Sequence, residues 1–478
     1  MNDNLMPGSH IHLIAICGVG MASLAGLLQA QGYRVTGADQ NVYPPMSTYL
    51  ETIGIGVLSG YSAEHLSSRP DLVIVGNAVS KNNPEAQAVL DRGIPYISFP
   101  QALGRFLIGS RTSLVVTGTH GKTTTTALLA WALTCAGYDP GFFVGGVPIN
   151  FGSGWSPGRG NYVVLEGDEY DSAFFDKGPK FLHYRPNKAI LTSLEFDHAD
   201  IYRDLEHLKA AFRRFIDLIP ADGFLLVCSE HPAAKEVASE AHCPVSFYGD
   251  IEPSDWTTRN VVNRNGKTLF EPCYQGKTEG IVQIGLFGRH NVNNVLAAYA
   301  MGRELGIGHK ELVQGLETFS GVKRRQEIKG EIDDILVIDD FAHHPTAVKE
   351  TIDAIRSAYP GRRLWAIFEP RSNTSRRRLF AGEFARALAA ADRVVIAGIY
   401  QPEKIPAEIR LSPAEVVDEI NRGTGSERAC YIEKALDIPW LISSEAQQGD
   451  IVLVMSNGGF DGVQDKILHA LENSARAS

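Results

Sequence analysis

The segment from Val116 to Thr124 has the residue types of a phosphate-binding loop and stands between an apolar run and a helical pattern. A helix N-terminus offers unpaired N–H groups and a partial positive charge. Glycines let this backbone wrap a phosphate, a lysine adds a mobile cation, and a threonine hydroxyl can ligate magnesium. The common loop has four residues between its glycines, but only two separate Gly118 from Gly121. The segment predicts a nucleotide-phosphate site, with an ordinary strand-to-helix turn as the alternative, and its residues are Gly118, Thr119, His120, Gly121, Lys122, Thr123 and Thr124.

Two later segments place acidic and histidine side chains just beyond predicted strands. Four carboxylates, at positions 166, 168, 169 and 171, follow the run that ends at Glu166. Carboxylates at the C-terminal edge of a parallel sheet suit magnesium, and Glu166 stands closest to the strand end. His198 follows another apolar run and predicts a second metal ligand or a contact to the transferred phosphoryl group. The alternatives are a solvated acidic loop and a structural histidine.

The first turn of the chain, Gly18-x-Gly20-x-x-Ser23, resembles a dinucleotide-binding turn without its third glycine. Asp39 follows at the end of the second predicted strand, where such folds contact a ribose hydroxyl. The turn predicts a nucleotide-diphosphate site formed by Gly18, Val19, Gly20, Met21 and Asp39. A nicotinamide site and a purely structural turn are the alternatives.

Polar residues that begin later helices or follow later strands are further candidates. His290, Asn291 and Asn294 open a helix and predict base or ribose contacts, with helix capping as the compatible alternative. Either Arg324 or Arg325 is suited to stabilise phosphoryl charge when a domain closes.

The third segment carries two groups of basic side chains after its strands. Adjacent residues on a loop rarely point at one metal ion, so we expect His343 and His344 to contact a ligand rather than form a zinc site. The loop with Arg371 and Arg376 is suited to recognise carboxylates, because a guanidinium group binds them with two parallel hydrogen bonds. A solvated helix start is the alternative for that loop.

Apolar runs rich in Val and Ile alternate with helical patterns along the whole chain, which predicts an α/β protein with largely parallel sheets. Strand-and-turn patterns restart at His10, Ser113 and Ile335. We therefore expect three domains, at residues 1–108, 109–322 and 323–478. The first and third are expected to be Rossmann-like, and the second to be of the P-loop ATPase type.

Bulk properties exclude several classes of function. A net charge of -10 argues against a general nucleic-acid binder, and no apolar run approaches the roughly 20 residues of a membrane span. Six scattered cysteines and a first segment without signal-peptide features favour a reduced, cytoplasmic protein. An oxidoreductase reading offers no purpose for the Gly-Lys-Thr segment, and a non-catalytic nucleotide-binding regulator remains the other alternative.

Together these motifs resemble the Mur ligase family, in the family's order along nearly the whole chain. The resemblance implies that ATP binds to the 118–124 loop and to His290, Asn291, Asn294, Arg325 and Asp340. It implies magnesium at Thr123, Glu166 and His198, and a catalytic role for Lys122, Glu166 and His198. It further implies a UDP-sugar at the first turn, and a peptide near His343, Arg371 and Arg376.

Within this family, the first domain resembles that of members that accept UDP-N-acetylmuramic acid. Tyr170, the stretch from Phe174 to Pro186 and the Arg371 loop depart from the alanine-adding pattern. These departures imply a ligase that joins the muramoyl carboxylate to the tripeptide L-alanyl-γ-D-glutamyl-meso-diaminopimelate through an acyl phosphate. Addition of L-alanine is the alternative. We expect a monomer or a weak homodimer.

Overall fold

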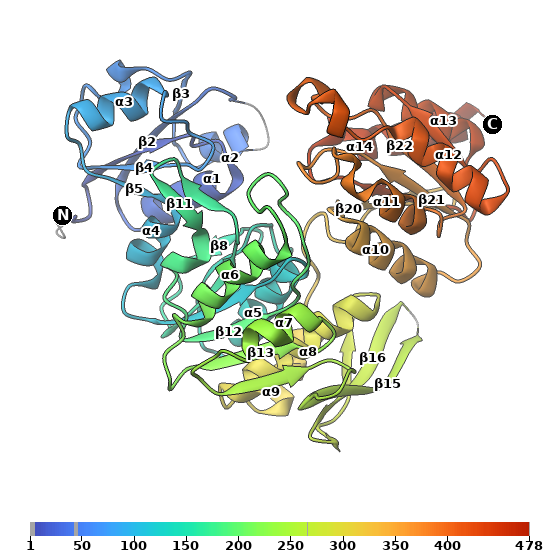
Figure 1. The fold of residues 1–478 in the computed structure, drawn as a ribbon, viewed down its shortest axis with the longest axis horizontal. Helices are drawn as coiled ribbons and strands as arrows, with labels where there is room; N and C mark the ends of the chain where they lie inside the picture. The colour runs from blue at the N-terminus through green and yellow to red at the C-terminus, as the bar shows by residue number, and fades with distance from the viewer. Residues whose placement is uncertain (1–4, 43–45, 265, 478) are drawn as a thin grey trace.

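The computed structural model describes residues 5–42, 46–264 and 266–477. Its strands form three main sheets that follow one another along the chain, and each sheet is flanked by helices. Figure 1 shows the first and third sheets as two lobes above the middle one, with the chain passing through the middle unit between them. This arrangement matches the α/β class expected from the sequence.

The first sheet is parallel throughout, with the order β3-β2-β1-β4-β5. Strand β1 ends at Ile14, three residues earlier than the apolar run suggests, because Ala15 takes a left-handed conformation with φ 67°. Its strands are β1 His10–Ile14, β2 Arg34–Asp39, β3 Val57–Ser59, β4 Leu72–Val75 and β5 Tyr96–Ser98. Its helices are α1 Val19–Ala30, α2 Met46–Thr52, α3 Pro84–Asp91 and α4 Phe99–Leu103.

The middle sheet contains β6 at its centre, between β9 and β12, so the 118–124 loop leaves the sheet next to both strands. Its parallel part comprises β6 Thr112–Thr117, β7 Gly141–Phe143, β9 Tyr162–Gly167, β12 Lys188–Leu191, β13 Phe224–Cys228 and β14 Val245–Tyr248. Its antiparallel strands are β8 Trp155–Ser156, β15 Trp256–Arg264, β16 Lys267–Tyr274, β17 Lys277–Thr278 and β18 Val282–Ile284. Its helices are α5 Lys122–Cys135, α6 Leu205–Ile216, α7 Pro232–Ala238, α8 Arg289–Glu304 and α9 His309–Glu317.

The third sheet has the order β19-β20-β24-β21-β22-β23. Strand β19 pairs antiparallel with β20 and was not anticipated from the sequence, because its alternating polar residues give no apolar run. The strands are β19 Glu327–Ile332, β20 Ile335–Asp340, β21 Leu364–Phe368, β22 Arg393–Ala397, β23 Ala429–Ile432 and β24 Ile451–Met455. The helices are α10 Pro345–Ala358, α11 Ala381–Leu388, α12 Pro413–Thr424, α13 Ile438–Glu445 and α14 Val463–Ala477.

The first and middle units share one hydrophobic core, whereas the third unit has its own. Phe99 of the first unit packs edge-to-face on Phe143 of the middle unit, with ring centroids 5.4 Å apart. Trp155 Nε1 also donates to the Tyr49 hydroxyl at 3.0 Å across this junction. The third unit's apolar clusters contain only its own residues. The first two units are therefore joined by a shared core, whereas the third meets the middle unit through polar contacts and a ring contact of Phe287 with Tyr359.

A small antiparallel pair of strands, β10 Asp171–Ala173 and β11 Asp176–Pro179, also links the first two units. Asp176 accepts a hydrogen bond from the Ser98 hydroxyl at 2.9 Å and pairs with His183 at 2.8 Å. The stretch that departs from the alanine-adding pattern thus lies at the junction between these two units.

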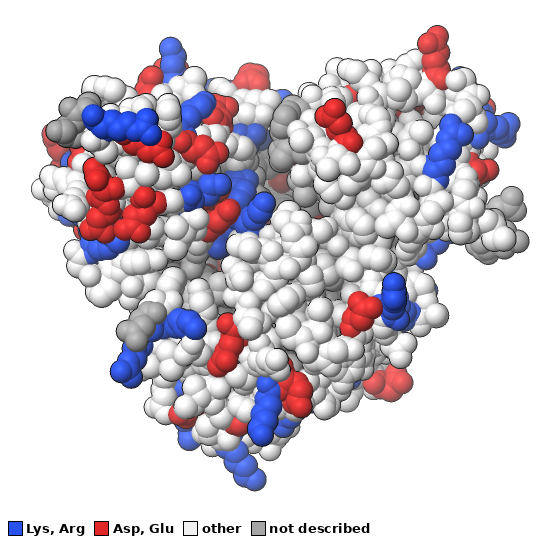
Figure 2. Space-filling view, turned by 180° about the vertical axis from the view of Figure 1, so that it is seen from behind, with Lys and Arg blue, Asp and Glu red and all other residues white. Residues whose placement is uncertain are grey.

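No helix in the described part of the chain is long and apolar enough to cross a membrane. On the face shown in Figure 2, the Lys and Arg side chains that can be seen are interspersed with Asp and Glu, and most of the surface is uncharged. That face therefore shows no continuous basic strip among the described residues, in agreement with the acidic net charge.

A buried carboxylate joins β21 to the start of β24. Asp450 accepts hydrogen bonds from Arg363 Nη2 at 2.6 Å and from Trp365 Nε1 at 2.9 Å. Burial pushes the pKa of Asp450 upward, but the hydrogen bonds from Arg363, the Gln447 amide and Trp365 outweigh it and lower the pKa. The ionised carboxylate therefore stabilises the third unit.

We predict that Asp450→Ala lowers the free energy of unfolding of the third unit by about 2–3 kcal/mol at pH 7, because it leaves three donors without this acceptor. The pKa of Asp450 is lower in the folded state, so this stabilisation is present above pH ~4 and is lost as the pH falls through the folded pKa. Urea unfolding of both proteins at pH 7 and pH 3 measures the difference. Arg378→Ala, which removes an exposed pair with Glu415, is the control and should leave the transition unchanged. An equal difference at both pH values would contradict the assignment.

Candidate active site

The 118–124 loop connects β6 to α5 and has the backbone shape that only glycine accepts at two positions. Gly118 has φ 133° and Gly121 has φ 78°. A Cβ on Gly118 would lie 2.3 Å from Thr192 Oγ1, and one on Gly121 would lie 2.5 Å from Asn294 Oδ1. The loop is therefore pressed between the end of β12 and the start of α8. The first turn of α5 contains no acidic residue, so its N-terminus presents its positive end to the loop.

Lys122 and His198 meet at one buried carboxylate, Glu169. Lys122 Nζ lies 2.9 Å from Glu169 Oε2, and His198 Nε2 lies 3.1 Å from Glu169 Oε1. Burial alone would lower the pKa of Lys122, but Glu169 and Asp168 outweigh it and raise the pKa. Burial would raise the pKa of Glu169, yet Lys122 and His198 hold it at about 2. His198 likewise has its pKa raised to about 9, against burial, by Glu169 and Asp197.

Glu166 lies beside Thr123, as the sequence predicts for a magnesium site. Thr123 Oγ1 donates to Glu166 Oε1 at 2.8 Å, and the Gly145 amide donates to Glu166 Oε2 at 2.6 Å. Burial and the neighbouring Asp168 raise the pKa of Glu166. Glu166 and the Thr123 hydroxyl therefore offer neighbouring oxygen donors. A hard divalent cation bound there would stabilise the buried negative charge of Glu166.

Arg325 reaches this group from the linker before the third unit. Its Nη2 donates to Thr123 Oγ1 at 3.3 Å, and burial lowers its pKa. The neighbouring residues Arg324 and Gln326 both have positive φ, 62° and 51°. Asp340 accepts a hydrogen bond from the Gln326 amide at 2.8 Å and holds this linker in place.

The start of α8 lies against the loop, where the sequence predicts base or ribose contacts. Asn294 Oδ1 accepts from Thr125 Oγ1 at 3.1 Å, while its Nδ2 donates to Asn291 Oδ1 at 3.2 Å. Neither asparagine caps the helix, because Gly288 is the N-cap residue and its cap has no side-chain hydrogen bond. A cavity of about 350 Å³ adjoins this helix start and is lined by residues that include His290, Gly288, Glu350 and Ala354. Its volume lies within the range of small-molecule sites.

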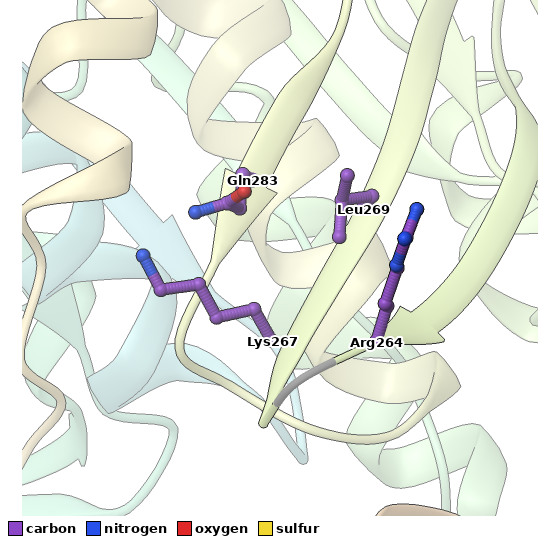
Figure 3. A pocket seen from close by; sticks show the side chains of 4 residues that line it. All are labelled: Arg264, Lys267, Leu269 and Gln283. Atoms are coloured by element: carbon purple, nitrogen blue, oxygen red, sulfur yellow. The ribbon is translucent and has the colours of Figure 1, made fainter.

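Another surface pocket lies away from these residues, on the hairpin of β15 and β16. Figure 3 shows that Arg264, Lys267, Leu269 and Gln283 line it. None of the residues selected from the sequence belongs to that lining. The hairpin pocket is therefore no part of the candidate site.

The first turn lies between β1 and α1, and Asp39 supports it from the end of β2. Asp39 Oδ2 accepts from the Cys17 amide at 2.9 Å, and Asp39 Oδ1 accepts from the Asn41 amide at the same distance. Val19 is half exposed, whereas the side chain of Met21 is buried in the core. Gly18, Val19 and Gly20 therefore offer the accessible backbone of this turn, and the Asp39 carboxylate holds its shape.

The basic loop after β21 has two arginines in different surroundings. Arg371 lies over the Tyr400 ring, 3.6 Å from its centroid, and pairs with Glu369 at 3.3 Å. Arg376 is buried and donates to the carbonyls of Tyr400 and Gln401 and to Asn373 Oδ1. Arg376 thus fastens the loop, and Arg371 is the more accessible of the two.

His343 and His344 diverge, as the sequence analysis expects of neighbouring loop residues. His343 Nδ1 lies 2.9 Å from the Phe341 carbonyl, and burial lowers the pKa of His343 although the charge of Asp197 opposes this. His344 instead faces Glu195, at 3.8 Å. Asp197 also accepts from the Thr374 hydroxyl at 2.5 Å, so the loop after β12 contacts two loops of the third unit.

Two carboxylates of the site were not singled out from the sequence. Glu169 belongs to the noted acidic run, but its distance from the strand end gave no reason to prefer it over Glu166. Its position opposite Lys122 depends on the turn between β9 and β10. Glu195 stands three residues before His198, and only the fold places it beside His120, at 3.2 Å.

Models of three Mur ligase domains match consecutive parts of this chain. The model described as "Mur ligase family, catalytic domain" matches residues 10–111, and "Mur ligase middle domain" matches residues 116–302. The model described as "Mur ligase, glutamate ligase domain" matches residues 324–458. Together they cover most of the chain in the order of its three sheets.

Similar proteins are found among curated sequences and solved structures. The UDP-N-acetylmuramate–L-alanyl-γ-D-glutamyl-meso-2,6-diaminoheptandioate ligase of Escherichia coli K12 is 40% identical over 98% of this chain and 99% of its own length. The UDP-N-acetylmuramate–L-alanine ligase of Salinibacter ruber is 34% identical over 97% of this chain and 95% of its own. The crystal structure of a murein peptide ligase from Psychrobacter arcticus superposes with a TM-score of 0.72 at 37% identity, over 98% of this chain and 99% of that one. The chain is a member of the Mur ligase family.

Proposed function

We propose that this chain joins the carboxylate of UDP-N-acetylmuramic acid to the amine of L-alanyl-γ-D-glutamyl-meso-diaminopimelate, with ATP converted to ADP and phosphate. The main support is the 40% identity, over nearly the full length of both chains, to the Escherichia coli ligase named for these substrates. Tyr170 adds local support, since it departs from the alanine-adding pattern and lies against Lys180, whose Nζ is 4.0 Å from its ring centroid. The reaction places the protein in the cytoplasm, where ATP and UDP-sugars are available.

In this proposal each of the three domains binds a different substrate. Residues 1–108 bind the UDP-sugar at the turn of Gly18 to Met21, and residues 109–322 bind ATP. Residues 323–478 close over the peptide, with His343 and Arg371 facing it and Arg376 holding the loop. The separate hydrophobic cores of the third unit support such a movement, because polar contacts at its boundary can be exchanged without exposing a core.

The phosphates of ATP bind to the 118–124 loop and the N-terminus of α5. Lys122 then turns from Glu169 to the phosphates, and Arg325 neutralises the charge on the transferred group. The helix start at His290, Asn291 and Asn294 contacts the nucleoside, beside the cavity lined by His290 and Glu350. Asp340 holds the linker that carries Arg325, and we propose that it also contacts the ribose.

Thr123, Glu166 and His198 are the residues that would hold magnesium. The paired oxygens of Thr123 and Glu166 fit a hard cation, and His198 lies across Glu169 from Lys122. A bound magnesium ion supplies positive charge that offsets the charge on phosphate oxygens. Lys122 and Arg325 add to that neutralisation from the protein itself.

A carboxylate is a poor electrophile, because an oxide leaving group departs badly. Transfer of the γ-phosphoryl group to the muramoyl carboxylate gives an acyl phosphate, which the peptide amine attacks, and phosphate leaves from the tetrahedral intermediate. Alignment and charge neutralisation carry most of this catalysis. The carboxylates and His198 near Lys122 are assigned to its charge balance and to magnesium, so we assign no general base and propose that the amine binds deprotonated.

Phosphate release tests the proposed substrates directly. With ATP, Mg²⁺ and UDP-N-acetylmuramic acid present, we expect the tripeptide to stimulate phosphate release at least about 100-fold more than free L-alanine, because the tripeptide offers additional carboxylates for the Arg371 loop to bind. Preference for L-alanine would instead support the alanine-adding alternative. If neither the tripeptide nor L-alanine stimulates phosphate release, the protein is not a ligase of either kind.

Lys122→Ala should abolish ATP-dependent product formation, with a loss of at least about 10³-fold in kcat, because a charge on the transferred phosphoryl group is left unneutralised. Circular dichroism should show an intact fold, since α5 tolerates alanine. Product formation is measured by chromatography of the UDP-linked species. Full activity in a folded Lys122→Ala variant would exclude the loop assignment.

Arg371→Ala should raise the KM for the tripeptide about 10–100-fold and leave the KM for ATP nearly unchanged, because a bidentate contact to a carboxylate is lost. Initial rates are measured with each substrate varied in turn. Arg378→Ala is the matched control, since Arg378 lies on the same loop but pairs with Glu415 at 2.7 Å on the surface. Equal effects of Arg371→Ala on both KM values would count against a peptide contact.

A further inference from the structure

Three potential metal ligands converge where the 118–124 loop meets the third unit. His120 Nε2 lies 3.2 Å from Glu195 Oε2, and His344 Nδ1 lies 3.8 Å from the same oxygen. One ligand atom from each of the three residues lies within 4.8 Å of the other two. His120 and Glu195 belong to the middle unit, whereas His344 is the N-cap residue of α10 in the third. The cluster therefore spans a domain boundary.

His344 is buried without a hydrogen-bond partner. Its residue is 5% exposed, and both ring nitrogens lack a partner among the described residues. Buried polar atoms are nearly always paired, so two unpaired nitrogens on one side chain need an explanation. A neutral imidazole ring without a hydrogen-bond partner offers a lone pair to a cation.

The donor types and their separations suit one class of ion. Zinc–nitrogen and zinc–oxygen bonds of about 2.0–2.2 Å in a tetrahedron place the donors roughly 3.4 Å apart. The 3.2 and 3.8 Å separations lie on either side of that value. Two imidazoles and one carboxylate favour zinc and similar transition metals over magnesium, which prefers oxygen donors.

We propose that His120, Glu195 and His344 form a site for a divalent transition-metal ion of the zinc type, which links the 118–124 loop to the N-terminus of α10. The site is separate from the magnesium position, because it uses none of Thr123, Glu166 and His198. His231, the N-cap residue of α7, is a further possible donor, since its Nδ1 lies 3.6 Å from Glu195 Oε1. The fourth position is left to His231 or to water.

Occupation of this site ties the middle and third units together. His120 and His344 can bind one ion together only in the present arrangement of the two units. Binding of the ion therefore favours this arrangement over others. The same ion constrains His120, which lies two residues from Lys122 in the loop. Zinc-type ions in slight excess over the enzyme are therefore expected to slow domain opening and turnover even when Mg²⁺ is saturating.

Cobalt(II) is a suitable probe, because its visible absorption reports the ligand set without any need for activity. The full-length, chelator-treated protein is titrated with CoCl₂ in the presence of saturating Mg²⁺. We expect one equivalent to bind with the absorption bands of a tetrahedral or five-coordinate nitrogen–oxygen site. His344→Ala and Glu195→Gln should each weaken binding at least about tenfold.

Two further variants separate this site from other histidines. His198→Ala removes the histidine of the magnesium position and should retain the cobalt spectrum, as should His242→Ala, which removes an exposed histidine. Loss of the spectrum in His198→Ala with retention in His344→Ala would overturn the proposal. Absence of a stoichiometric spectrum in the wild type would overturn it as well.

Thermal unfolding checks that the Glu195→Gln variant still folds. Thermal unfolding without metal should give similar midpoints for wild type and Glu195→Gln, and zinc should raise the midpoint of the wild type alone. Since Glu195→Gln keeps the size and shape of the side chain, a folded variant with unchanged cobalt affinity would also refute the site. This inference does not depend on which peptide the enzyme joins.

Discussion

The organisation of the site depends on one charge balance, in which two cations share the buried carboxylate of Glu169. Lys122 comes from the helix after β6, and His198 from the loop after β12. Burial opposes both charges, and Glu169 is the strongest of the groups that raise the pKa of Lys122 and of His198. Glu169 therefore links the loop after β6 to the loop after β12.

The order of the strands in the sheets brings these charged residues together. Strands β9, β6 and β12 are neighbours in one parallel sheet, so their C-terminal ends bring Glu166, the 118–124 loop and His198 to a single edge. The third sheet adds Asp340 from the corresponding end of β20. Polar groups of the two units meet between these strand ends, and a ring contact of Phe287 with Tyr359 adds an apolar link, so a domain movement has to exchange few contacts.

The α/β fold and several candidate site residues could be predicted from the sequence, because they depend on short patterns of neighbouring residues. The strand-loop-helix pattern around Lys122 and the strand ends at Glu166 and Asp340 need only periodicity and position to be recognised. The roles of Glu169, Glu195 and Arg376 depend on which loops meet in space. Strand β19 was missed for a related reason, since an exposed edge strand carries no apolar run. The domain bounds and the roles assigned to individual ligand-binding residues remain predictions.

The linker before the third sheet combines two properties that are usually separate. Arg324 and Gln326 hold left-handed backbone conformations that cost non-glycine residues energy, and Arg325 between them reaches Thr123. The linker of the third unit thus carries the arginine that we propose to meet the phosphates. In that proposal, an outward movement of the third unit would take this positive charge away from the 118–124 loop, so the loop would have its full charge only while the units are together.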